Sequence, residues 1–135
     1  MLRARAQILA WLAAVIIAGL VWRKADLGLP FFAWKYGGSA LWGAMVFLLV
    51  RLWRPQATGR FALVASLLIA AAVEFSRLCE TPWLNEFRLT LAGQLLLGRV
   101  FSLWNLVAYA AGIGAAAMLM RLATRLPRTG SPPAP

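Results

Sequence analysis

Four long apolar stretches constrain the fold of this 135-residue chain more than any other feature. They cover residues 6–22, 36–53, 61–78 and 100–120, and Lys or Arg residues stand at their boundaries. A helix needs roughly 20 apolar residues, with about 17 as the lower limit, to cross the hydrocarbon core of a bilayer. The sequence therefore predicts four membrane-spanning helices and an all-α, integral membrane four-helix bundle in residues 1–126.

Composition supports a membrane protein and excludes several other classes. Hydrophobic residues make up 62% of the chain, against roughly 45–50% in soluble domains. The formal net charge is +10, but the basic residues are scattered at the ends of apolar stretches. Nucleic-acid-binding proteins instead cluster them on one face or in one tract. We therefore expect membrane lipids, and no nucleic acid, as partners.

Cysteine and histidine usage argues against metal sites and disulfides. The chain has no histidine and a single cysteine, Cys79. These counts exclude an intramolecular disulfide and a zinc site with the usual ligands. We expect no metal and no cofactor, and we interpret Cys79 as a small buried or interfacial residue.

The N-terminus begins like a secretory signal, with Arg3 and Arg5 before an apolar stretch. This stretch ends at Trp22, Arg23 and Lys24, without a small-residue cleavage site. We interpret it as an uncleaved first span.

Charge asymmetry predicts the orientation of the bundle. Four spans place both termini on one side, which carries eight Lys and Arg residues against six on the other. The positive-inside rule therefore predicts cytoplasmic termini. Residues 127–135 are rich in Pro, Gly and Ser, which predicts a short disordered tail.

The connection between the third and fourth spans, residues 79–99, is the long one. Pro82, Gly93 and Gly98 exclude a single regular helix across the bilayer. Apolar residues still recur at roughly helical spacing, namely Leu84, Phe87, Leu91 and Leu95. This pattern predicts an interfacial or re-entrant segment against the outer leaflet.

Glu74 is the unusual residue of the third span. It lies 14 residues after Arg60, about 21 Å along a core of roughly 30 Å, and therefore in the outer half of the membrane. Arg77 follows on the same helical face, where it can pair with Glu74 while its stem extends toward the outer headgroups. Leu67, Ala70 and Ala71 continue this face inward, so we expect the acid to point into the bundle.

The fourth span offers a partner surface for Glu74. Asn105, Tyr109, Gly112 and Ala116 fall on one helical face, at a depth that brings Asn105 near Glu74. Small residues permit close helix packing. We expect this role for Ser39, Gly43, Ala108, Gly112 and Ala116.

Two interpretations of Glu74 remain open. An ionised acid in a membrane marks a functional site by default, but pairing with Arg77, Asn105 or Tyr109 also serves to hold helices together. For Tyr109 and Gly112 taken alone, a structural role is the simpler interpretation. Arg88 fits a lipid-facing cation as well as a site residue.

A family pattern is carried by residues 35–42 and 73–76, by Pro82, Trp83, Leu84 and Arg88, and by Leu97, Gly98, Phe101, Asn105, Leu106, Tyr109 and Gly112. This pattern resembles a family of small bacterial inner-membrane proteins of unknown function, related to VanZ-like proteins. The resemblance covers about residues 35–113.

This chain departs from the pattern at three positions. Arg77 stands where the resemblance implies a glutamine, Asn105 where it implies an aspartate, and Ser39 where it implies another acid. These differences remove the second carboxylate that metal binding or paired acid–base chemistry requires. The resemblance thus implies a location and an architecture without implying a reaction.

The leading hypothesis is a non-enzymatic protein of the bacterial inner membrane that recognises an envelope lipid or glycolipid headgroup. The pocket would consist of Glu74, Arg77, Arg88, Asn105 and Tyr109. The alternative is a structural subunit that docks a membrane-protein partner or a second copy, with Glu74 pairing helices. An enzyme ranks third, since no nucleophile with a base, phosphate-binding loop or metal cluster is discernible, and a transporter ranks below it.

Overall fold

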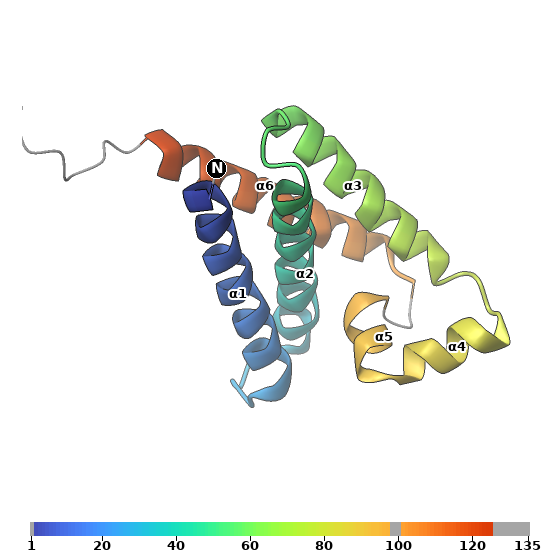
Figure 1. Ribbon diagram of the computed structural model, residues 1–135. Coiled ribbons are helices and arrows are strands. Elements are labelled where there is room, and N and C mark those ends of the chain that lie inside the picture. Colours follow the sequence, from blue (N-terminus) through green and yellow to red (C-terminus); the bar gives the residue numbers. More distant parts are fainter. Residues whose placement is uncertain (1, 98–100, 126–135) are drawn as a thin grey trace, which may run out of the picture.

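The computed structural model describes residues 2–97 and 101–125, which form helices and no strands (Figure 1). Four helices are long and apolar enough to cross a membrane: α1 (Leu2–Lys24), α2 (Phe31–Trp53), α3 (Gly59–Ser76) and α6 (Leu103–Arg125). Two short helices, α4 (Pro82–Leu89) and α5 (Leu91–Leu96), connect α3 to α6. The predicted all-α bundle is confirmed. The predicted tail at residues 127–135 lies outside the described residues.

Capping residues decide where the helices begin and end. The second helix begins at Phe31, directly after Pro30 at the N-cap position, because proline lacks the N–H that a helix interior needs and disfavours a helical conformation of the residue before it. Thr58 caps α3 by accepting a hydrogen bond from Phe61 N at 3.2 Å. Hydropathy alone does not contain these signals, so the helix bounds differ from the apolar stretches by several residues.

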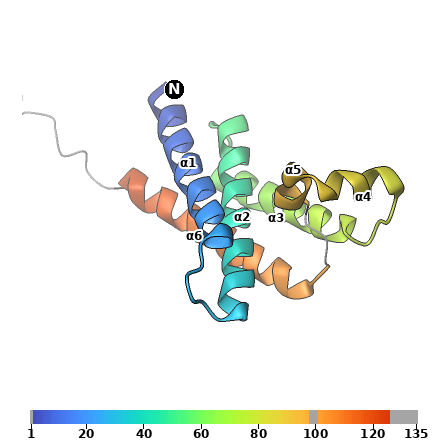
Figure 2. The same cartoon turned by 90° about the horizontal axis from the view of Figure 1, so that it is seen from below.

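The second helix occupies the centre of the bundle. It packs against α1, α3 and α6, and α3 also packs against α6 (Figures 1 and 2). Phe47 and Leu48 of α2 and Ile113 of α6 are almost completely buried in this core. Helix association in lipid depends on such close packing, because lipid tails are as apolar as the side chains that they would replace.

The outward faces of the long helices remain apolar. Ile17, Leu68 and Val107 expose 61%, 66% and 59% of their surface, respectively. Contiguous apolar surface of this kind is rare on soluble monomers. It fits lipid contact around the bundle.

The segment between α3 and α6 folds into two short helices that meet at an angle (Figures 1 and 2), and this α4–α5 segment is called the hairpin below. Thr90 adopts an extended conformation that separates α4 from α5, and its Oγ1 accepts a hydrogen bond from Gly93 N at 3.0 Å. A Cβ at position 93 would overlap the backbone of Phe87, so glycine permits the close approach of the two helices. The hairpin lies at the end of the bundle opposite the start of α1 and the end of α6 (Figure 1).

Candidate functional site

The inner face of α3 carries the polar centre of the bundle. Ala62, Ser66, Ala70 and Glu74 recur every four residues and are all buried. Ser66 satisfies its own hydroxyl by donating to Ala62 O at 2.6 Å. Leu67, which was also expected on this face, is 37% exposed. Because these residues recur every four positions, Glu74 lies on the same buried face, between α3 and α6.

Glu74 is saturated with hydrogen bonds from its own chain. Its Oε1 accepts from Ser102 N at 2.7 Å and from Asn105 Nδ2 at 3.2 Å. Its Oε2 accepts from Tyr109 Oη at 2.8 Å and pairs with Arg77 Nη1 at 2.9 Å. A carboxylate offers about four acceptor sites, and the residue is 0% exposed. No acceptor site of Glu74 is left over for a ligand.

Asn105 extends this network to the central helix. Its Oδ1 accepts a hydrogen bond from Ser39 Oγ of α2 at 3.3 Å, and Ser39 also lies within 3.3 Å of Lys35 O. Ser39, expected to act only as a small packing residue, thus also joins the polar centre. The network spans α2, α3 and α6.

Arg77 points into the protein instead of toward the headgroups, contrary to expectation. Its Nη2 donates to Tyr109 Oη at 3.0 Å, and its Nε donates to Leu97 O at 2.5 Å. Leu97 is the residue that ends α5. A single planar guanidinium therefore connects Glu74, α6 and the α4–α5 hairpin.

Arg88 does not join the Glu74 cluster as proposed from the sequence, and it is not a lipid-facing cation. It is 4% exposed, and it donates to Ser76 O at 2.5 Å and to Cys79 O at 2.9 Å. Ser76 is the last residue of α3, and Cys79 lies in the connection that follows it. Arg88 thus attaches α4 to α3. The neighbouring Cys79 is exposed.

The predicted packing residues lie at the α2–α6 contact. A Cβ on Gly43 would stand 2.6 Å from Tyr109 O, and a Cβ on Gly112 would overlap the backbone of Ala40. Ala108 is buried, and Ala116 is half-buried against the core. These small residues bring Tyr109 and Asn105 close to α2.

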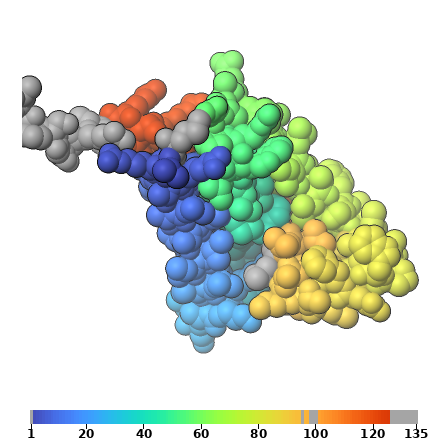
Figure 3. Space-filling model, viewed as in Figure 1, coloured from blue at the N-terminus to red at the C-terminus, as the bar shows by residue number. Residues whose placement is uncertain are grey.

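A cleft that the sequence did not reveal lies between α1, α2 and α5. Its volume is about 310 Å³, near the lower end of the range for ligand sites. Its walls are apolar except for the Arg23 guanidinium and the indole N–H of Trp42, and they comprise Val15, Ile16, Gly19, Leu20, Arg23, Gly38, Leu41, Trp42, Met45, Ala92 and Leu96. Figure 3 shows the hollow between α1 and α5, with α2 behind it.

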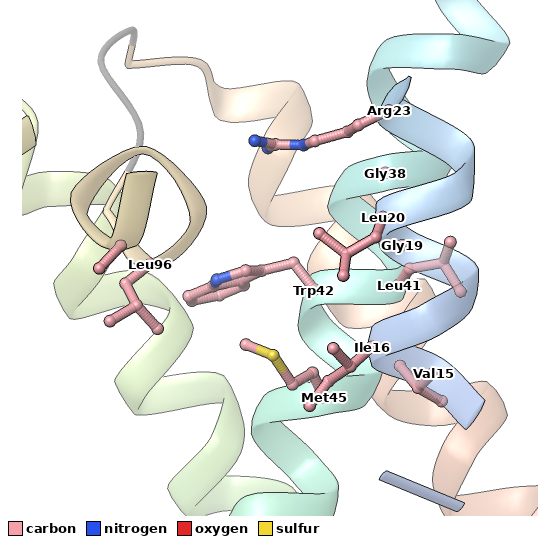
Figure 4. Close-up of a pocket in the computed structure, with 11 residues that line it drawn as sticks. Val15, Ile16, Gly19, Leu20, Arg23, Gly38, Leu41, Trp42, Met45 and Leu96 are labelled. Atoms are coloured by element: carbon pink, nitrogen blue, oxygen red, sulfur yellow. The ribbon is translucent and has the colours of Figure 1, made fainter. Parts of the chain in front are cut away.

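Two polar groups distinguish the cleft. Arg23 reaches across one end of it from α1, while Trp42 extends from α2 toward Leu96 of α5 (Figure 4). Trp42 Nε1 is buried without a hydrogen-bond partner among the described residues. Buried indole N–H groups usually find a partner, so a bound molecule with an acceptor would satisfy this group.

The cleft is in direct contact with the polar centre. The ring of Trp42 packs on that of Tyr109, with centroids 4.7 Å apart and planes at 48°. In the sequence, Arg23 stands at the end of the first apolar stretch and Trp42 lies within the second. The sequence could not join them, because α5 forms the third wall only after the chain turns at Thr90.

A second, more apolar cleft of about 240 Å³ lies between α1, α2 and α6. Neither cleft contains a set of metal ligands. In the part of the chain that the structure describes, no three Cys, Asp or Glu residues come together in a group that could hold a metal ion.

Comparison with known proteins finds a matching family. The family described as protein of unknown function DUF2809 matches residues 28–113, from the loop before α2 to the middle of α6. This match includes the whole Glu74 network and the hairpin. No solved structure matches the chain.

Proposed function

The chain belongs to the DUF2809 family, whose function is unknown, and we propose that it is a membrane protein that binds one anionic amphiphile in the cleft between α1, α2 and α5. The main support for this proposal is the combination of three features: an apolar cleft, Arg23 at one end of it, and the unpaired Trp42 N–H in its wall. An acyl chain fits the apolar walls. A phosphate or carboxylate headgroup fits the guanidinium.

This proposal keeps the idea of headgroup recognition but moves it from Glu74 to the cleft. Glu74 has its full set of donors inside the chain, which supports the helix-pairing interpretation of this acid. Arg23 makes no hydrogen bond or ion pair within the described residues. Its charge is therefore available to a ligand.

The setting of this function is also part of the proposal. We place the protein in the bacterial inner membrane, with cytoplasmic termini, on the basis of its resemblance to small bacterial membrane proteins and its excess of cations beside the termini. Kinship with VanZ-like proteins rests on the same resemblance. The cleft then opens in the outer half of the bilayer, and binding without catalysis is the proposed activity.

Lipid retention tests the proposal directly. Purified protein is reconstituted in nanodiscs of phosphatidylcholine with phosphatidylglycerol, and retained lipid is identified by native mass spectrometry. A Cβ on Gly19 meets no neighbouring atom, so Gly19→Leu fills the cleft without disturbing the helices. We expect wild type to retain one phosphatidylglycerol and Gly19→Leu to lose it. Gly114→Leu is the matched control, because its Cβ also meets no atom and it lines neither cleft.

Arg23→Gln tests headgroup recognition in the same assay. Loss of a hydrogen bond to a charged group costs about 1.5 kcal/mol, so binding of phosphatidylglycerol should weaken about tenfold. Binding of phosphatidylcholine should change little. The proposal is contradicted if wild type, Gly19→Leu and Arg23→Gln all retain the same amount of each lipid.

A partner subunit is the second candidate function. The observation in its favour is the cleft between α1, α2 and α6, which has an almost wholly apolar lining with Gly112 and Ala116 in its wall. Small residues of this kind allow another helix to approach closely. Co-purification of a stoichiometric membrane protein or a second copy from mild detergent supports this function, and a monomer alone contradicts it.

A further inference from the structure

The Glu74 network touches two different walls of the cleft. On one side, Tyr109 donates to Glu74 at 2.8 Å, and its ring packs on Trp42 of the α2 wall. On the other side, Arg77 pairs with Glu74 at 2.9 Å and donates to Leu97 O at the end of α5. A single side chain therefore connects the Glu74 carboxylate to each wall, Tyr109 on one side and Arg77 on the other.

Little backbone contact holds the wall formed by α5 against the long helices. Helices α4 and α5 pack on each other, but in the described part of the chain the backbone of neither comes close to that of a long helix. Two arginines of different function attach the hairpin. Arg88 holds α4 to the end of α3, whereas Arg77 reaches α5 itself.

We propose that Glu74 and Arg77 are positioning residues for the cleft, and that they set the separation of Trp42 from α5 and thereby the affinity for the bound amphiphile. This inference rests on the proposed function. It gives the buried acid a role besides joining helices, since the ion pair holds two walls that belong to elements far apart in the sequence.

The physical reason lies in the shape of the guanidinium. Arg77 directs Nη1 to Glu74, Nη2 to Tyr109 and Nε to Leu97 O, three acceptors in three directions. A planar guanidinium spreads its donors over three nitrogen atoms and can reach all of these acceptors at once, whereas the three donors of a lysine ammonium share a single nitrogen. Arg77→Lys therefore keeps the charge beside Glu74 while it releases α5. Tyr109→Phe correspondingly keeps the ring against Trp42 and removes its attachment to Glu74.

Lipid affinity provides the first test. Phosphatidylglycerol binding is titrated in phosphatidylcholine nanodiscs for wild type, Arg77→Lys, Tyr109→Phe and the control Arg60→Lys, which makes the same change at an exposed position of α3. We expect both network variants to bind about fivefold or more weakly, a usual size for coupling between sites, and Arg60→Lys to bind like wild type. Unchanged affinity in both network variants overturns the inference.

Label distances provide a readout that a purely stabilising role would not change. In a Cys79→Ser background, spin labels at the exposed positions Ala18 of α1 and Leu91 of α5 report the separation across the cleft. We expect a narrow distance distribution in wild type and a broad one in Arg77→Lys at temperatures where both remain folded. A narrow, unshifted distribution in Arg77→Lys overturns the inference.

The two proposals fail differently. If wild type and Gly19→Leu retain the same lipid, the proposed function is wrong, while the label distances still decide whether Arg77 positions α5. If only Gly19→Leu loses lipid and the network variants do not, the cleft is the site and the positioning role is wrong.

Discussion

Glu74 shows what one buried carboxylate requires of its neighbours. Its four donors come from the turn before α6, from two side chains of α6 and from Arg77. In Glu74→Gln the side-chain NH₂ has to face hydrogen-bond donors whichever way the amide is oriented. Arg77, whose side chain is only 11% exposed, also loses its counter-charge. We expect a loss of about 3 kcal/mol in the free energy of unfolding, measured by SDS-driven unfolding in mixed micelles.

The double variant Glu74→Gln/Arg77→Gln separates charge from hydrogen bonding. Removing both charges leaves no buried ion without a partner, so the double variant should be more stable than the sum of the two single changes implies, by about 1 kcal/mol or more. Glu86→Gln, at an exposed position of α4, should unfold like wild type. If Glu74→Gln is as stable as wild type, the stabilising role of the hydrogen bonds to Glu74 is contradicted.

At the scale of helices, the α2–α6 contact depends on backbone proximity. A Cβ on Gly112 would overlap the backbone of Ala40, which cannot move aside as a flexible side chain can. Gly112→Ala should therefore cost about 2 kcal/mol and weaken the Ser39–Asn105 hydrogen bond across the same contact. Gly114→Ala, two positions further along α6, should be neutral or slightly stabilising, because its Cβ meets no neighbour. Equal melting temperatures of the two variants would contradict this account.

Helices and their facing surfaces could be predicted from the sequence because both follow short-range rules. Hydropathy gives the four long helices, and helical spacing aligns Asn105 and Tyr109 on one face. The spacing of three residues also predicts the pairing of Arg77 with Glu74. The other acceptors of Arg77 and those of Arg88 could not be predicted, since they come within reach only in the tertiary structure. Arg77, for example, reaches Leu97 O only because the chain turns at Thr90, which hydropathy does not record. The cleft could not be predicted for the same reason, because its third wall, α5, also follows the turn at Thr90.

For the whole molecule, charge is distributed unequally between the two ends of the bundle. Three of the four acids, Asp26, Glu80 and Glu86, lie in or near the connections opposite the termini, and the fourth is paired within the bundle. The start of α1, the α2–α3 connection and the end of α6 share the other end (Figure 1). The side with the termini carries eight Lys and Arg residues and the opposite side carries six. This difference is a small margin for determining orientation.

Paired reporters test the resulting topology. A fluorescent protein that folds in the cytoplasm and a phosphatase active only outside it are fused to the C-terminus or inserted after Gly28, in the exposed α1–α2 loop where φ is +63°. We expect fluorescence from C-terminal fusions and phosphatase activity from Gly28 insertions. The exposed pair Arg54→Gln/Arg60→Gln removes two of the eight cations and equalises the sides at six each, so both reporters should then become partly active at both positions. Lys24→Gln/Lys35→Gln removes two cations from the opposite side and should preserve the original orientation. Phosphatase activity at the C-terminus of the unaltered chain would reverse the assignment and place the cleft in the cytoplasmic leaflet.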